Sequence, residues 1–139
     1  MRLVEKHKNS YILRLDPGEE FISVIENFCA ENNIFSGWVQ AVGSTKALNL
    51  AFYELGEKKY KTSAFNEFLE ILSVTGNIAK KEGKIFVHAH GVFGRSDMSV
   101  IGGHIKKCVI SATGEIMIHA GKNEMHRELD EETGLHLLG

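Results

Sequence analysis

Proline, cysteine and surplus positive charge are all scarce in this chain of 139 residues. The formal net charge is −2 and the sequence pI is near 6.4. The chain therefore lacks the basic excess that attracts nucleic-acid phosphates independently of base sequence, and nucleic-acid binding starts at a disadvantage. The two cysteines, Cys29 and Cys108, each lie in an apolar stretch, which favours buried thiols over a disulfide or a nucleophile and suits a reducing cytoplasm.

Long apolar runs are also missing. No run reaches the roughly 18 residues that a membrane-spanning helix needs, and the first residues, MRLVEKHKNS, have no apolar centre typical of a signal peptide. We therefore expect a cytoplasmic protein with no membrane association. With 43% hydrophobic and 24% charged residues, the composition is that of an ordinary globular protein, and the length predicts one domain over residues 1–139.

The pattern that is present predicts one helix among many strands. The only proline, Pro17, lies in a helix-start segment. Phe21, Val24, Ile25 and Phe28 recur at helical spacing and predict a helix that runs through Asn32. The other segments are rich in β-branched and aromatic residues, as strands are. Expected strands cover residues 11–15, two segments between residues 35 and 55 separated at Gly43 and Ser44, residues 58–63, residues 67–79, and residues 107–120 as one strand bent at Gly114 or as two. The charged tail from Asn123 is expected to dock through its last leucines, Leu135, Leu137 and Leu138.

Residues 85–105, IFVHAHGVFGRSDMSVIGGHI, predict a hairpin that carries three histidines. His88 and His90 are two residues apart on a strand and point from the same face. If the turn is centred on Ser96, His104 lies opposite His88 and Gly102 opposite His90, with opposed β-carbons roughly 4.5 to 5.5 Å apart. Three converging neutral imidazoles suit zinc, or another divalent metal, with a fourth position left for water or a small-molecule ligand. The alternative is that the histidines are ordinary polar strand residues, and a slip of one residue would turn His104 away.

Five segments spread over nearly the whole chain carry a family resemblance. They are DPGEEF (16–21), GWVQAVGS (37–44), FLEILSVTGNIA (68–79), HAHGVFGRSDMSVIGGHI (88–105) and RELDEETGLHLL (127–138). Together they resemble the PPC domain, which is named for plants and prokaryotes and carries a DNA-binding label. The resemblance implies an α+β subunit with a large curved, mostly antiparallel sheet packed on one main helix, usually assembled as a homotrimer. It also implies a zinc site at His88, His90 and His104.

The plant members of this family reach DNA through separate basic segments with an Arg-Gly-Arg core beside proline, and this chain has no such segment. A more distant resemblance, to acetolactate decarboxylase, implies a similar fold and zinc held by a His-x-His pair and a later histidine. A zinc-dependent lyase or hydrolase acting on a small carbonyl or oxo-acid substrate is therefore the alternative to a DNA-associated or regulatory role. Such an enzyme would need an acid or base, for which Glu70 and Glu115 are candidates, and a positioning cation, for which Arg95 is one. Each of these three is more simply explained as a solvated or paired surface residue.

The remaining singled-out residues have structural interpretations. Asp97 is expected to form the turn and Trp38 to be buried rather than to stack on bases. Arg127, Glu128 and Asp130 are expected to form a charged helix-terminal face or a subunit contact. A third function stays open beside the two above, a structural or ligand-sensing trimer whose metal only stiffens the hairpin.

Overall fold

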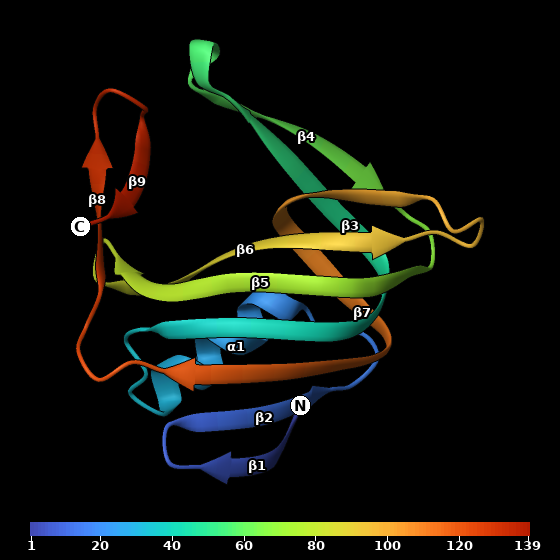
Figure 1. Cartoon of the computed structure of the whole chain (residues 1–139), viewed down its shortest axis with the longest axis horizontal. Coiled ribbons are helices and arrows are strands. Elements are labelled where there is room, and N and C mark those ends of the chain that lie inside the picture. Colours follow the sequence, from blue (N-terminus) through green and yellow to red (C-terminus); the bar gives the residue numbers. More distant parts are fainter.

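Nine strands and one α-helix make up the computed structural model, which describes residues 1–139 (Figure 1). The helix is α1 (Phe21–Glu31), and a short 3-10 turn covers Leu55–Glu57. All strands belong to one sheet, antiparallel throughout except where β5 and β8 run parallel over two residue pairs. The strands are β1 (Arg2–His7), β2 (Ser10–Leu15), β3 (Gly37–Glu54), β4 (Lys59–Phe65), β5 (Leu69–Lys81), β6 (Lys84–Gly94), β7 (Val100–Ala120), β8 (His126–Asp130) and β9 (Leu135–Leu138). The expected α+β class with a large, mostly antiparallel sheet is confirmed.

The sheet curves strongly because four of its strands form a closed ring of pairings. Strand β3 pairs with β5, β5 with β6, β6 with β7, and β7 returns to β3. Side chains alternate along each strand, so one face of these strands supplies the buried residues, among them Phe93, Ile105 and Leu50. The strands cross closely at Gly43, where a β-carbon would lie 2.2 Å from the Thr113 carbonyl oxygen. Only glycine fits there, so Gly43 lets β3 pass β7 without ending it.

Helix α1 covers the buried face of the sheet, against β6 and β7 (Figure 1). Phe21 and Ile25 are fully buried beneath it, as the helical spacing predicted. Glu20 is the N-cap, and its carboxylate accepts hydrogen bonds from the backbone N–H groups of Ser23 at 2.8 Å and Cys108 at 3.0 Å. One side chain therefore satisfies a free helix-end donor and fixes the helix to β7.

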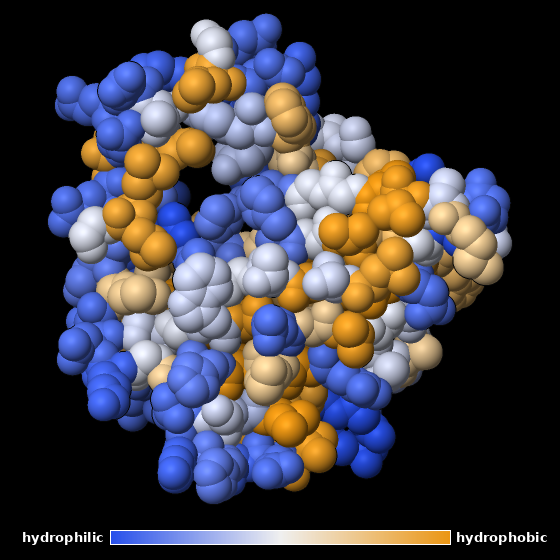
Figure 2. All heavy atoms as spheres, in the orientation of Figure 1, coloured by the Kyte–Doolittle hydropathy of each residue, from blue (hydrophilic) through white to orange (hydrophobic).

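The opposite face of the sheet is uncovered and carries large apolar side chains (Figure 2). Ile12 on β2 lies beside Met117 on β7, which lies beside Gln40 on β3, and Val42 lines the same shallow hollow. Trp38 is on this face too and is 57% exposed, so the prediction that it is buried is wrong. Its buried strand neighbours are Gly37 and Val39, which place the indole on the uncovered side by alternation.

Several element boundaries differ from expectation. Strand β1 was not predicted because all six of its residues are exposed and leave no apolar pattern. Strand β3 is one strand with register shifts around Gly43 rather than two, and β7 joins the return strand of the histidine hairpin to residues 107–120 without a break. The tail is a two-stranded hairpin, β8–β9. Of the leucines expected to dock, Leu135 is half-buried, whereas Leu137 and Leu138 stay 42% and 45% exposed. No helix of the structure has the length and apolar character needed to cross a bilayer.

Candidate metal centre

The three histidines of the predicted site lie together on adjacent strands. His88 and His90 come from β6 and His104 from β7, and His90 is paired directly with His104. Their ring centroids are 5.0 Å (His88 to His90), 5.1 Å (His88 to His104) and 5.3 Å (His90 to His104) apart. One nitrogen from each ring lies within 4.8 Å of the other two. His104 is buried, His88 is half-buried and His90 is exposed, so the cluster is open on one side.

The strand register differs by two residues from the one expected. His104 lies opposite His90 rather than His88, and Gly102 lies opposite Val92 rather than His90. The pairing of Gly94 with Val100 centres the turn on Asp97, and the next residue, Met98, adopts a left-handed backbone conformation with φ 67°. A shift of two residues leaves every side chain on its predicted face, so the three rings still converge. Asp97 is the expected turn former, accepting hydrogen bonds from the Ser99 backbone and hydroxyl groups.

Burial and nearby positive charges keep two of the rings, His88 and His104, neutral. Loss of solvation, with the charges of Arg127, His90 and Lys106, lowers the pKa of His88 to about 4. Loss of solvation, with Lys106 and the other histidines, lowers the pKa of His104 to about 3. Both rings are therefore uncharged at neutral pH, the state in which one nitrogen of an imidazole has a lone pair that can bind a metal ion.

Arg127 is the residue whose role the sequence reasoning missed. It is 9% exposed, and one guanidinium nitrogen donates to the Asn77 side-chain oxygen at 2.7 Å and to His88 Nδ1 at 3.2 Å. Its other terminal nitrogen donates to the His136 carbonyl at 2.8 Å. The expectation that Arg127, Glu128 and Asp130 form a helix-terminal face is wrong, because β8 is a strand and Arg127 points inward at His88. The alternative, a subunit contact, stays a prediction. A lone arginine in an acidic tail gave no signal of the contact with His88 in the sequence.

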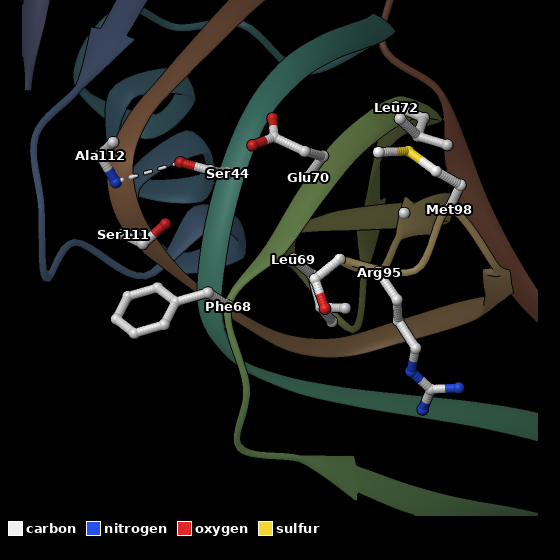
Figure 3. Close-up of a pocket in the computed structure, with 11 residues that line it drawn as sticks. Ser44, Phe68, Leu69, Glu70, Leu72, Arg95, Met98, Ser111 and Ala112 are labelled. Atoms are coloured by element: carbon white, nitrogen blue, oxygen red, sulfur yellow. Dashed lines mark hydrogen bonds between the residues drawn. The ribbon is translucent and has the colours of Figure 1, made fainter.

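The three candidate catalytic groups lie elsewhere. Glu70 and Arg95 line a separate pocket with Phe68, Leu72 and Met98 (Figure 3). Arg95 forms an ion pair with Glu67 at 3.1 Å. Glu115 is exposed on β7 opposite Val42 and lines the shallow hollow of the uncovered face. The structure therefore does not bring any of these side chains into the lining of the histidine site.

A cavity of about 380 Å³ lies beside the histidines, under the β8–β9 hairpin. His88 and His104 line it together with Tyr60 on β4, whose ring lies 5.0 Å from that of His104. Figure 2 shows the opening between the hairpin and the β3–β4 end of the molecule. The centre therefore has space for a small molecule next to it.

The sequence profile of the Plants and Prokaryotes Conserved (PCC) domain matches residues 2–121. The chain belongs to this family. It is the PPC domain to which the sequence segments point, and the matched range includes all three histidines and stops before the C-terminal hairpin.

Solved structures of other proteins agree with membership of the PCC-domain family. A candidate DNA-binding protein from Bacteroides thetaiotaomicron is 29% identical with a TM-score of 0.93, and the match covers 97% of this chain and 94% of that one. A metal-containing protein from Archaeoglobus fulgidus is 30% identical with a TM-score of 0.88, covering 99% and 98% of the two chains. Acetolactate decarboxylase from Bacillus subtilis shares only the fold, at 13% identity and a TM-score of 0.56 over 91% of this chain and 58% of that one. No curated protein sequence matches the chain significantly.

The donor set of this PCC-domain chain fits a divalent metal ion. Nitrogen ligands about 2.0 to 2.1 Å from a tetrahedral zinc would be about 3.3 Å apart. His90 Nε2 and His104 Nδ1 are 3.4 Å apart, which is close to that spacing. The donor atom of His88 lies within 4.8 Å of the other two. Three imidazole nitrogen donors with one open side are typical of zinc and of similar divalent ions.

Proposed function

We propose that this PCC-domain protein binds a divalent metal ion, zinc in particular, through His88, His90 and His104. The observation that carries the proposal is the convergence of three imidazoles, two of them held neutral, on one open point. The relation to the metal-containing Archaeoglobus protein supports it. Zinc would act as a Lewis acid or lower the pKa of a bound water, and these three residues would hold it.

Metal analysis of the purified protein, followed by zinc titration of chelator-treated protein, tests the proposal. We expect about one metal ion per chain, and a rise in melting temperature on adding zinc because a ligand that binds only the native state stabilises it. His104→Ala should weaken zinc binding at least a hundredfold. His126→Ala, which removes an exposed histidine outside the cluster, should leave the zinc affinity unchanged. Equal affinities for the two variants would refute the assignment.

We further propose that the chain assembles as a homotrimer and works in the cytoplasm. The uncovered sheet face supports assembly, because Trp38, Val42 and Met117 are 57%, 50% and 46% exposed on one surface. Apolar surface of this kind marks a contact with another protein surface. A molecular mass measured in solution three times that of the chain is the expected result.

A DNA-associated or regulatory role is the biological function that family membership supports. The candidate DNA-binding relative from Bacteroides carries this argument. Binding to duplex DNA should appear at low salt and fall steeply as salt rises, since phosphate contacts release counterions. Fluorescence anisotropy with labelled duplexes would measure it, and no binding even at low salt would count against the role.

The alternative is a zinc-dependent lyase or hydrolase for a small carbonyl or oxo-acid substrate. The cavity beside the histidines favours this alternative over a purely structural metal. Turnover of a panel of small carbonyl compounds by zinc-loaded protein, lost in His88→Ala, is the expected result. No turnover across the panel would leave the regulatory role as the better explanation.

A further inference from the structure

The cavity beside the histidines is lined by charge of one sign. Its cationic residues are Lys58, Lys59, Lys81, Lys106 and Arg127, and no aspartate or glutamate lines it. The chain as a whole has a net charge of −2, so this concentration of positive charge does not follow from composition. We call this space the cationic cavity.

Arg127 is buried in the wall of the cationic cavity without a counter-ion. None of its hydrogen bonds goes to a negatively charged group, since the partners are the Asn77 side chain, the His136 carbonyl and the His88 ring. Its Nε atom is buried with no hydrogen-bond partner, and no carboxylate oxygen lies within 4.0 Å of the guanidinium. A buried charge that is not paired is costly to stability, so an anion held beside Arg127 would stabilise the folded chain.

Two of the lysines are also free of carboxylates. The Lys106 ammonium lies 3.9 Å from the centre of the Tyr60 ring, and the Lys81 ammonium lies 5.4 Å from that of Phe86. Neither forms an ion pair, whereas Lys59 is paired with Glu57 at 2.6 Å and Lys58 donates to the Glu131 carbonyl. Three cations of the cavity, Lys81, Lys106 and Arg127, are therefore available to an anion that enters.

We propose that the cationic cavity binds a small organic oxyanion, a carboxylate or a phosphate ester, with its charged oxygens held by Arg127 and Lys106. Guanidinium groups suit both kinds of anion because their planar donors match paired oxygens. A volume of about 380 Å³ fits a metabolite-sized molecule. Because His88 and His104 line the same space, the bound molecule would lie against the imidazoles.

Calorimetric titration of the full-length protein with three probes tests the proposal. Malonate supplies carboxylates, inorganic phosphate supplies a phosphate, and malonamide has the shape of malonate without its charge. The titrations are made on chelator-treated protein that circular dichroism shows to be folded, so the result does not depend on metal binding. Binding of malonate or phosphate, but not of malonamide, is the expected result, and the preferred anion identifies the ligand class.

Two matched variants place the anion in the cavity. Lys106→Gln removes a cation of the cavity that makes no hydrogen bond or ion pair, so the variant should fold, and it should bind the preferred anion at least tenfold more weakly. Lys107→Gln removes the same charge from the next residue, which does not line the cavity, and should bind the anion like the original chain. Absence of anion binding, binding of malonamide, or equal losses in both variants would overturn the proposal. Zinc titration of the same samples reports separately on the metal site, so either hypothesis can fail alone.

Discussion

At the scale of single residues, a metal ion and Arg127 would compete for the same lone pair of His88. A neutral imidazole has one lone pair and one N–H group, and a guanidinium has only donors. Because Arg127 donates to His88 Nδ1, the single lone pair of His88 is already in use. Coordination of a metal by His88 therefore requires that this hydrogen bond be given up. A metal-bound histidine is normally held by an acceptor on its other nitrogen, which arginine cannot provide.

Replacing Arg127 by glutamine should tighten zinc binding. The glutamine amide offers a carbonyl acceptor for the N–H of a coordinated His88 and removes a positive charge from the neighbourhood of the ion. Since partners of ligating histidines change metal affinity by about tenfold or more, we expect a gain of about that size. Competition with a chromophoric chelator measures it. Arg127→Lys, which keeps the charge and the donors, is the control, and tighter binding by that variant than by Arg127→Gln would contradict the argument.

Glu26 on α1 predicts a pH effect away from the histidines. Burial raises the pKa of Glu26, although the Val87 N–H that it accepts at 3.1 Å acts in the opposite direction. A carboxyl with a raised pKa in the folded state contributes stability below its unfolded pKa, near 4.5, and that contribution is lost as the pH rises through the folded value. Glu26→Gln keeps an oxygen for Val87 and cannot ionise. Urea unfolding should show this variant gaining stability over the original chain as the pH rises from acid to neutral, while the exposed Glu31→Gln should show no such trend.

At the scale of elements, the C-terminal hairpin is joined to the rest of the sheet by fewer paired residues than link any other two neighbouring strands. Strand β8 pairs with β5 at two positions only, Lys80 with His126 and Lys81 with Arg127. The family profile ends at residue 121, before this hairpin begins. The hairpin nevertheless supplies Arg127 and one wall of the cationic cavity. The proposed metal site thus lies on β6 and β7 alone, whereas the cavity is built from these strands together with the hairpin.

A chain shortened to end at Glu124 separates these two parts. It keeps β6 and β7, so it should bind zinc at least as tightly as the full chain. It lacks Arg127 and the cavity wall, so its binding of the preferred anion should fall at least tenfold. Calorimetry measures both quantities, and a circular dichroism spectrum confirms that the sheet is intact. Full anion affinity in the shortened chain would show that the anion binds outside the cavity.

The sequence predicted elements well where burial leaves a regular pattern. Helix α1, strand β5 and the histidine hairpin all have such a pattern. Alternation placed His88 and His90 on one face, and His104 joins them because the turn differs from the expected one by an even number of residues in register. The position of the turn could not be predicted, because nothing in a methionine indicates that Met98 takes a positive φ. Gly43 was taken as a strand break, but its role depends on Thr113 of a distant strand.

The contact of Arg127 with His88 could not be predicted either, because it also depends on a distant strand. Arg127 acquires its role only because β8 aligns with the end of β5, a parallel pairing of segments that are 46 residues apart at Lys80 and His126. The charged residues were expected on a helix-terminal face or in a subunit contact, and Leu135, Leu137 and Leu138 were expected to dock. Strand β8 excludes the helix, and the subunit contact stays a prediction. Leu137 and Leu138 stay exposed, whereas Leu135 is half-buried.

At the scale of the whole molecule, the uncovered sheet face is where the proposed trimer would form its contact. Met117 lies at its middle, between Ile12 on β2 and Gln40 on β3. Met117→Glu would place a charge inside a trimer contact on this face, where an unpaired charge is strongly unfavourable. Sedimentation should show this variant as a monomer. Val4→Glu, at a 63% exposed position on β1, should remain a trimer. Trimeric Met117→Glu would place the contact elsewhere.

Strand β7 connects the histidine hairpin to the far side of the sheet. It spans Val100–Ala120, carries His104 near its start, and has Ile116 and Ile118 fully packed near its far end. It pairs with β2, β3 and β6 on the way. Neither end can come loose without breaking ladders shared with the other, so the strand joins the sheet into a single cooperative unit. Hydrogen exchange at Ile118, remote from the imidazoles, should therefore slow when an ion occupies them.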